Sequence, residues 1–158
     1  MWDKVREAAK LERLQLRRLL DEYRPLVDRC AANAPSHFEL AALSAMLHSF
    51  YTGVENIFKR IAVDLDGRTP RGDVWHRQLL DSMKAPGRGR PAVVSEELAT
   101  NLDDYLTFRH FFRHAYTFDL RWDRMKPLVL GCEETLRILE SELDRFFAAG
   151  SGSTHEPE

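Results

Sequence analysis

The sequence has no apolar stretch long enough to cross a membrane. Its longest apolar runs, such as Ala41–Leu47, are far shorter than the roughly 20 residues that a transmembrane helix needs. The first residues are charged and lack the apolar block of a secretory signal peptide. These absences argue against a membrane protein, and we expect the chain to act in the cytoplasm, away from membranes.

Cysteine is scarce, and metal-binding patterns are absent. Cys30 and Cys132 fall at inward-facing positions of expected amphipathic helices, which predicts buried free thiols. No Cys-x-x-Cys pair suggests zinc. The segment Asp64–Gly67 begins like a calcium loop but lacks the later acidic ligands, so calcium is not expected. We therefore expect no cofactor.

The chain also lacks the large positive charge of a protein that coats nucleic acid, since its net charge is -2 at pH 7. The balance reverses locally, with five Lys or Arg against two Asp between residues 109 and 126. Lys84, Arg88 and Arg90 crowd a single Gly- and Pro-rich loop. We expect Arg88 and Arg90 either to contact phosphate weakly or to lie in a solvated linker.

No segment shows the alternation of apolar and polar residues that is typical of a half-buried strand. Apolar residues recur instead at intervals of three and four, as on the buried face of a helix. The predicted helices cover residues 2–32, 36–65, a short stretch 73–83, 95–116 and 122–150. This pattern predicts an all-α, up-and-down bundle of four long helices and one short helix, without a sheet. One domain at residues 1–149 should precede a disordered polar tail at 150–158.

Local signals predict the helix boundaries. Ser36, followed three residues later by Glu, has the pattern of a capping box, and Ser95 should cap the fourth helix. Asp73 is the expected N-cap of the short helix. Pro25 should kink or interrupt the first helix, and Gly150 should end the last one.

The segment Phe-Arg-His-Phe-Phe-Arg-His-Ala-Tyr, which ends at Tyr116, mixes cations, imidazoles and rings in a way that packing does not require. At about 100° per residue, Arg109, Arg113 and Tyr116 lie within roughly 60° of one another. His110 and His114 form a second row, with His114 about 140° from Arg109. These two side chains therefore reach one substrate only if the helix ends near Arg113, or if a second copy of the chain supplies one of them.

The spacing Arg109-x4-His114-x-Tyr116 resembles the Arg-x4-6-His-x-Tyr signature of HEPN domains. Three flanking segments, at residues 51–58, 75–80 and 116–122, look like those of the HepT-like ribonuclease toxins of type VII toxin–antitoxin systems, in the same order. The resemblance covers about residues 36–147. The Arg/His/Tyr spacing alone would be weak evidence for the family, and the flanking segments make the match more specific.

This resemblance implies a metal-independent ribonuclease that works as a homodimer, with paired motifs forming one site. The side chains suit that chemistry, because His114 can move a proton to or from RNA and Arg109 can hold charged phosphate oxygens. Attack by the 2′-hydroxyl of RNA would leave a 2′,3′-cyclic phosphate and exclude DNA. Neither side chain is expected to support the core. The alternative is that both satisfy carbonyl groups at the helix end.

The resemblance also implies a partner for Tyr116. In HepT-like toxins a minimal, MntA-like nucleotidyltransferase antitoxin transfers AMP onto the tyrosine at this motif position. Phosphate charge added near Arg109 and Arg113 would block RNA. The alternative is a core or capping tyrosine. A competing function for the whole chain is a non-catalytic helical module that docks a nucleotidyltransferase.

Two further side chains are expected to support the site. Glu55 lies beside the apolar seam of the second helix, where an unpaired carboxylate would be costly, so it should pair with Arg109 or Arg113 and orient it. The alternative is a plain surface glutamate. His110, one turn before His114, could bind a metal with it, but no carboxylate follows at helical spacing in that row.

Overall fold

Helices make up most of the computed structural model, which describes residues 1–151. They are α1 (Trp2–Ala32), α2 (His37–Asp64), α3 (Trp75–Met83), α4 (Glu96–His114), the short 3-10 helix η1 (Thr117–Asp119) and α5 (Trp122–Ser151). Residues 1–151 contain no strand, so the all-α prediction is confirmed. The expected tail lies, from residue 152 onward, outside the described residues. None of these helices is both long enough and apolar enough to span a membrane.

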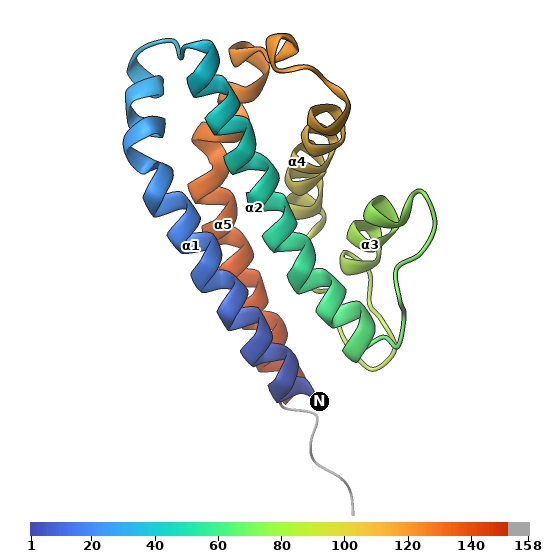
Figure 1. Cartoon of the computed structure of the whole chain (residues 1–158). Helices are drawn as coiled ribbons and strands as arrows, with labels where there is room; N and C mark the ends of the chain where they lie inside the picture. The colour runs from blue at the N-terminus through green and yellow to red at the C-terminus, as the bar shows by residue number, and fades with distance from the viewer. Residues whose placement is uncertain (152–158) are drawn as a thin grey trace, which may run out of the picture.

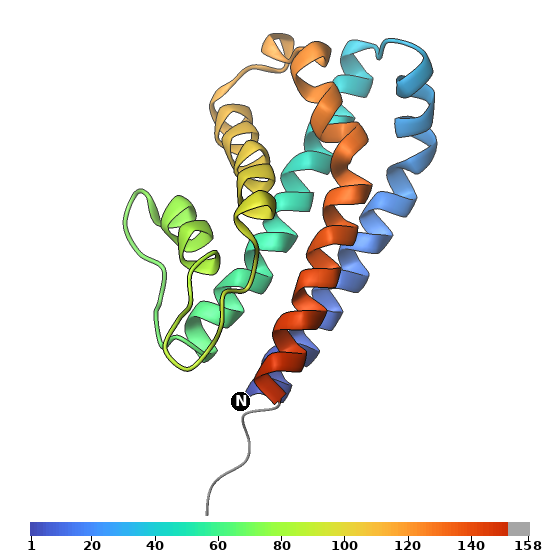
Figure 2. The same ribbon diagram turned by 180° about the vertical axis from the view of Figure 1, so that it is seen from behind.

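The four long helices run alternately up and down, as predicted (Figure 1). Helices α1, α2 and α5 lie side by side along the length of the molecule, and α4 packs on α2 and α5. The opposite view shows α3 standing on the outer side of α4 and α2, the two helices that hold it (Figure 2). One flank of the bundle therefore brings together α2, α3 and α4, the last of which carries the Arg/His motif.

Helix α2 is the central element, because it contacts every other helix of the bundle. Its buried apolar side chains recur at the predicted spacing: Leu40, Leu43, Leu47, Phe50, Val54, Ile57 and Ile61. Each such side chain removed from water contributes roughly 1.5–3 kcal/mol before the entropic cost of ordering the chain. The tightly packed helix α2 therefore holds the polar residues on its remaining faces in fixed positions.

Two helix starts agree with the sequence prediction. The Oγ of Ser36 accepts a hydrogen bond from the Glu39 N–H at 3.2 Å, and the Glu39 carboxylate accepts one from the Ser36 N–H at 3.0 Å. At the start of α4, the Oγ of Ser95 accepts from the Leu98 N–H at 3.1 Å. Both arrangements involve residues three positions apart, so the local sequence is enough to predict them.

The predictions for three other boundaries are wrong or hold only in part. Helix α1 runs unbroken through Pro25, so the interruption is absent, because losing one N–H does not end a helix packed along its length. Helix α3 follows Val74 rather than a cap at Asp73. Helix α5 continues through Gly150 to Ser151, the last described residue. Gly150 serves close packing, because a Cβ there would clash with the Trp2 ring.

The two cysteines are buried free thiols, as predicted. Burial raises the pKa of the Cys132 thiol, which keeps it protonated at neutral pH. A buried neutral thiol is a poor nucleophile. The cysteines therefore contribute to packing rather than to the site.

Candidate functional site

Arg109 lies on α4, but its side chain is held by α2. Its Nη2 donates to Oε2 of Glu55 at 2.9 Å, and its Nη1 donates a longer bond to Oγ1 of Thr52 at 3.4 Å. The guanidinium carbon lies 4.8 Å from the centre of the Tyr51 ring, within cation–π range. Only 5% of Arg109 is exposed. Arg109 is therefore buried and has its partners within one chain.

Glu55 is the buried anion of this site, with 3% of the residue exposed. Its pairing with Arg109 confirms the expected ion pair and excludes the surface-glutamate alternative. Removing one partner of a buried pair leaves an uncompensated charge, at a cost of about 3–5 kcal/mol. The expectation that Arg109 does not support the core is thus wrong. Burial and then the charge of Glu55 raise the pKa of the neighbouring Tyr51 phenol.

The third member of the cluster is His76 on α3, which was not predicted from the sequence as a site residue. Its Nδ1 lies 2.8 Å from Oε2 of Glu55 and 2.9 Å from Nη2 of Arg109. Nδ1 can donate to Glu55 or accept from Arg109, depending on the tautomer. Because the carboxylate can only accept and Nη2 of Arg109 already donates to it, we assign an Nδ1–H that donates to Glu55. The only sequence signal for it was its place in the 75–80 segment. We call Arg109, Glu55 and His76 the Arg109 cluster.

A pocket of about 310 Å³ opens between α3 and α4, beside the Arg109 cluster. Its lining includes the following ionisable side chains: Asp73, His76, Arg77, Arg109, His110 and Arg113. Of the three guanidinium groups, that of Arg77 is paired with Asp103 and that of Arg109 with Glu55. Within the described residues, Arg113 therefore carries the unpaired positive charge of the pocket, beside two titratable imidazoles. Such a surface attracts an anion of the size of a phosphate group.

His114 does not line this pocket. Helix α4 ends at His114, one residue after Arg113, so His114 still belongs to the helix. Its exposed ring meets the His110 ring edge to face at 4.9 Å between centroids. Arg109 and His114 therefore stay on separate faces of one chain. Within residues 1–151, neither Arg109 nor His114 hydrogen-bonds to a helix-end carbonyl, so the capping alternative has no geometric support.

Tyr116 lies beyond the end of α4, so it does not share a helical face with Arg109 as expected. The backbone turns extended at Ala115, with ψ of 151°. Tyr116 is 71% exposed, and its ring stacks on that of Phe118 at 5.2 Å between centroids. Its side chain makes no capping hydrogen bond to η1. The core and capping alternatives are thus wrong, and the phenol is open to solvent.

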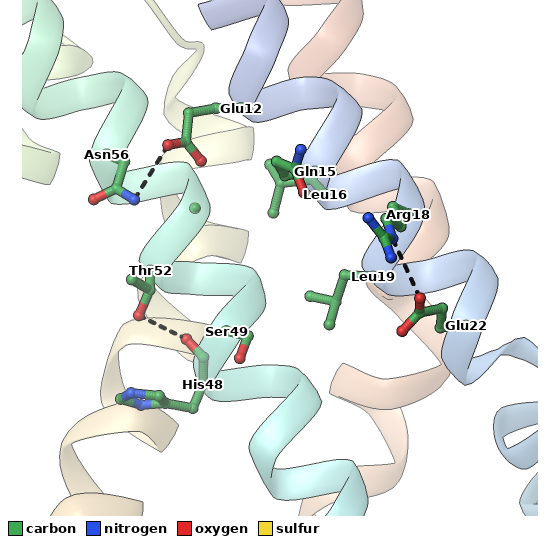
Figure 3. A pocket seen from close by; sticks show the side chains of 11 residues that line it. Glu12, Gln15, Leu16, Arg18, Leu19, Glu22, His48, Ser49, Thr52 and Asn56 are labelled. Atoms are coloured by element: carbon green, nitrogen blue, oxygen red, sulfur yellow. Dashed lines mark hydrogen bonds and ion pairs between the residues drawn. The ribbon is translucent and has the colours of Figure 1, made fainter.

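A second pocket, of about 500 Å³, lies in the groove between α1 and α2 (Figure 3). Thr52 connects its wall to the Arg109 cluster, because Oγ1 donates to the carbonyl oxygen of His48 at 2.9 Å and also accepts from Arg109. Gly53 permits close packing here, since a Cβ would lie 2.6 Å from Cδ2 of Leu16. The two helices therefore meet closely behind the cluster.

His48 is a half-buried imidazole beside the cationic site. Its Nδ1 is enclosed and has no hydrogen-bond partner in the described part of the chain. Its ring lies 6.0 Å from that of Phe112. Burial, followed by the positive charges of Arg109 and Arg113, lowers the pKa of His48. This residue is thus held neutral, next to two cations.

The loop that carries Arg88 and Arg90 corrects another expectation. Arg90 is buried and forms a two-pronged pair with Asp66, from Nε to Oδ1 at 2.6 Å and from Nη2 to Oδ2 at 2.8 Å. It also donates to the carbonyl oxygens of Ser82, Ala85 and Pro91. Arg90 therefore staples the loop to the end of α2 and is not available to RNA phosphate. Arg88 is exposed.

Metal ligation was the alternative for His110 and His114. Within the part of the chain that the structure describes, no three or more His, Cys, Asp or Glu side chains are grouped so as to hold a metal ion. The two histidines thus have no third ligand of these types.

Comparison with known proteins shows to which family the chain belongs. A family model described as HepT-like protein matches residues 42–149, more than half of the sequence. The chain belongs to the HepT-like family. No curated protein and no solved structure matches it. The HepT-like region contains the whole Arg109 cluster, His114 and Tyr116, whereas α1 lies outside it.

Proposed function

We propose that this HepT-like protein is a metal-independent endoribonuclease. The observation that carries the proposal is the pocket between α3 and α4, where a fixed guanidinium adjoins imidazole and further guanidinium groups. RNA cleavage by its own 2′-hydroxyl needs a base, an acid and a fixed positive charge, all of which these groups provide. Membership of the HepT-like family supports a toxin of this kind.

Arg109 is the proposed phosphate-binding cation. Its Nη1 and Nη2 are occupied by residues of α2, but its Nε–H has no hydrogen-bond partner within the described residues and is not among their enclosed, unpaired atoms. A donor already fixed by a buried carboxylate needs no reorganisation when charge develops on the phosphate. The exposed Arg113 adds positive charge at the mouth of the pocket.

His114 is the proposed proton-transfer residue, contributed by a second copy of the chain. It is exposed at the end of α4 and outside the pocket of its own chain. A two-fold axis near the ends of two α4 helices would bring each His114 toward the pocket of the other copy. This homodimer would form two equivalent composite sites.

The proposed reaction needs no metal. A base removes the 2′-hydroxyl proton, the 2′-oxygen attacks the adjacent phosphorus, and the bond from phosphorus to the 5′-oxygen breaks. An acid protonates the leaving 5′-oxygen. The products are a 2′,3′-cyclic phosphate and a 5′-hydroxyl end, while the Nε–H of Arg109 donates to a non-bridging oxygen.

Tyr116 is the proposed site of neutralisation. Its exposed phenol oxygen would attack the α-phosphorus of ATP on a minimal, MntA-like nucleotidyltransferase antitoxin, with loss of pyrophosphate and of the phenol proton. The AMP group would bring negative charge close to Arg113, three residues before Tyr116, and exclude RNA by charge pairing and bulk.

A non-catalytic docking module remains the alternative function, favoured by one observation. Arg109 is buried in an ion pair and so has a structural role even without a substrate. Such a chain would bind a nucleotidyltransferase through the exposed end of α4 and leave RNA intact.

The two functions differ in one experiment. We expect the purified chain to cleave single-stranded RNA in the presence of EDTA, leaving 2′,3′-cyclic phosphate ends, and His114→Ala to abolish cleavage. His37→Ala is the control, because His37 is exposed at the far end of α2, about 27 Å along the helix from Glu55. Intact RNA together with binding of a nucleotidyltransferase would favour the docking module, and inhibition by EDTA would favour a metal site.

A further inference from the structure

The proposed cleavage requires two proton transfers, one from the 2′-hydroxyl and one to the 5′-oxygen. His114 of a second copy supplies one of them. Two other imidazoles, His76 and His110, line the pocket on the same chain as Arg109. Their surroundings differ, and the difference decides which is prepared for catalysis.

His76 is anchored through one ring nitrogen and open at the other. Its Nδ1 faces the buried oxygen of Glu55 at 2.8 Å, while 28% of its side chain remains exposed. Its Nε2 has no hydrogen-bond partner within residues 1–151, yet it is not among the enclosed unpaired atoms there. With the hydrogen on Nδ1, the Nε2 lone pair is free for a ligand in the pocket.

His110 lacks such an anchor. It is exposed, and its ring contact is with the equally exposed His114. No carboxylate hydrogen-bonds to it in the described part of the chain. Nothing therefore fixes its tautomer or its ring orientation, whereas Glu55 fixes both for His76.

We infer that His76 is a catalytic residue of this site, the general base that takes the 2′-hydroxyl proton of RNA onto Nε2. The inference rests on the proposed function and assigns His114 of a second copy the complementary role of acid. Nε2 of His76 gains the proton that the 2′-oxygen loses, and the 5′-oxygen gains one from His114. Exchange with water then restores both imidazoles.

In this mechanism Glu55 is a positioning residue, because it holds both the base, His76, and the phosphate-binding cation, Arg109. Its Oε2 accepts from both His76 Nδ1 and Arg109 Nη2, at 2.8 and 2.9 Å. A single buried oxygen thus fixes the separation between the group that takes the proton and the group that holds the phosphate. Stacking of Trp75 on the His76 ring, at 3.6 Å between centroids, further limits its movement.

The test distinguishes the roles of the two ring nitrogens of His76. In His76→Asn the amide nitrogen takes the position of Nδ1 and still donates to Glu55, but nothing replaces Nε2. We expect its cleavage rate to fall about 10²–10⁴-fold, the size of a general-base contribution, with RNA binding and thermal unfolding close to wild type. His37→Asn, the matched control, should cleave at the wild-type rate.

Each outcome bears on a different claim. If His76→Asn cleaves as fast as the wild type, the His76 assignment is wrong and the proposed ribonuclease stands. If the wild type cleaves no RNA, the proposed function fails and this inference fails with it. Independently of activity, ¹⁵N NMR of the wild-type imidazoles should find His76 as the Nδ1–H tautomer, and Glu55→Gln should weaken that preference. An Nε2–H tautomer in the wild type would overturn the inference.

Discussion

The guanidinium of Arg109 and the carboxylate of Glu55 lie 2.9 Å apart, and both side chains are almost closed to solvent. This ion pair ties the motif helix α4 to the central helix α2. The residue proposed to bind the phosphate is therefore also part of the fold. A mutation of Arg109 is therefore expected to change both the stability of the fold and the rate of RNA cleavage, and the two effects must be measured separately.

We predict that Arg109→Ala and Glu55→Ala each lower the free energy of unfolding by about 3–5 kcal/mol, because each leaves a buried charge unpaired. Urea denaturation measures this directly. Arg113→Ala is the control, since Arg113 is exposed and should change stability by no more than about 0.5 kcal/mol. Equal stability of Arg109→Ala and the wild type would show that the pair does not hold α4 to α2.

His48 should make stability depend on pH. Folding lowers the pKa of His48, so the folded chain binds fewer protons at this position than the unfolded chain, whose imidazole titrates near its ordinary value of about 6.5. Stability then rises with pH through this range and is lost as the pH falls below about 6.5. We predict that from about pH 7 to about pH 5 the wild type loses more stability than His48→Gln.

The control for this measurement is His37→Gln, because His37 is exposed at the start of α2. It should follow the wild-type pH dependence. Parallel curves for His48→Gln and the wild type would mean that His48 titrates alike in the folded and unfolded chain.

The sequence predicted what depends on near neighbours in the chain. Capping by Ser36 and Ser95 and the three-four spacing of α2 involve residues within one or two helical turns, so the bundle was correctly predicted. Arg90 was misassigned because its partner, Asp66, is 24 residues away and is brought close only by the fold. A Gly- and Arg-rich loop has the same local sequence whether its arginine is solvated or buried.

The site was predicted in part for the same reason. Pairing of Glu55 with an arginine followed from its place beside an apolar seam, where a carboxylate needs a partner. His76 was not identified because its relation to Glu55 depends on how α3 packs against α2. The position of Tyr116 depended on where α4 ends, and helix ends are less certain from sequence than helix interiors.

Modification of Tyr116 should silence the chain. With a minimal nucleotidyltransferase and ATP, we predict that the mass of the wild type rises by whole AMP units and that RNA cleavage stops, because the added phosphate competes near Arg113. Tyr116→Phe should retain cleavage and resist both changes. Phe118→Leu is the matched control, since it removes the stacking partner but keeps the phenol. Equal modification of Tyr116→Phe and the wild type would assign the AMP to another residue.

The composite site is tested most directly by combining two inactive variants. Arg109→Lys keeps a positive charge opposite Glu55 but removes the Nε–H, and His114→Ala removes the imidazole from the second copy. Each variant alone should be inactive. When the two are co-expressed, half of the dimers pair one chain of each kind and contain one intact site of two, so we predict about a quarter of the wild-type cleavage rate. If the co-expressed chains fold and form mixed dimers but cleave RNA no faster than either variant alone, the composite ribonuclease site is contradicted.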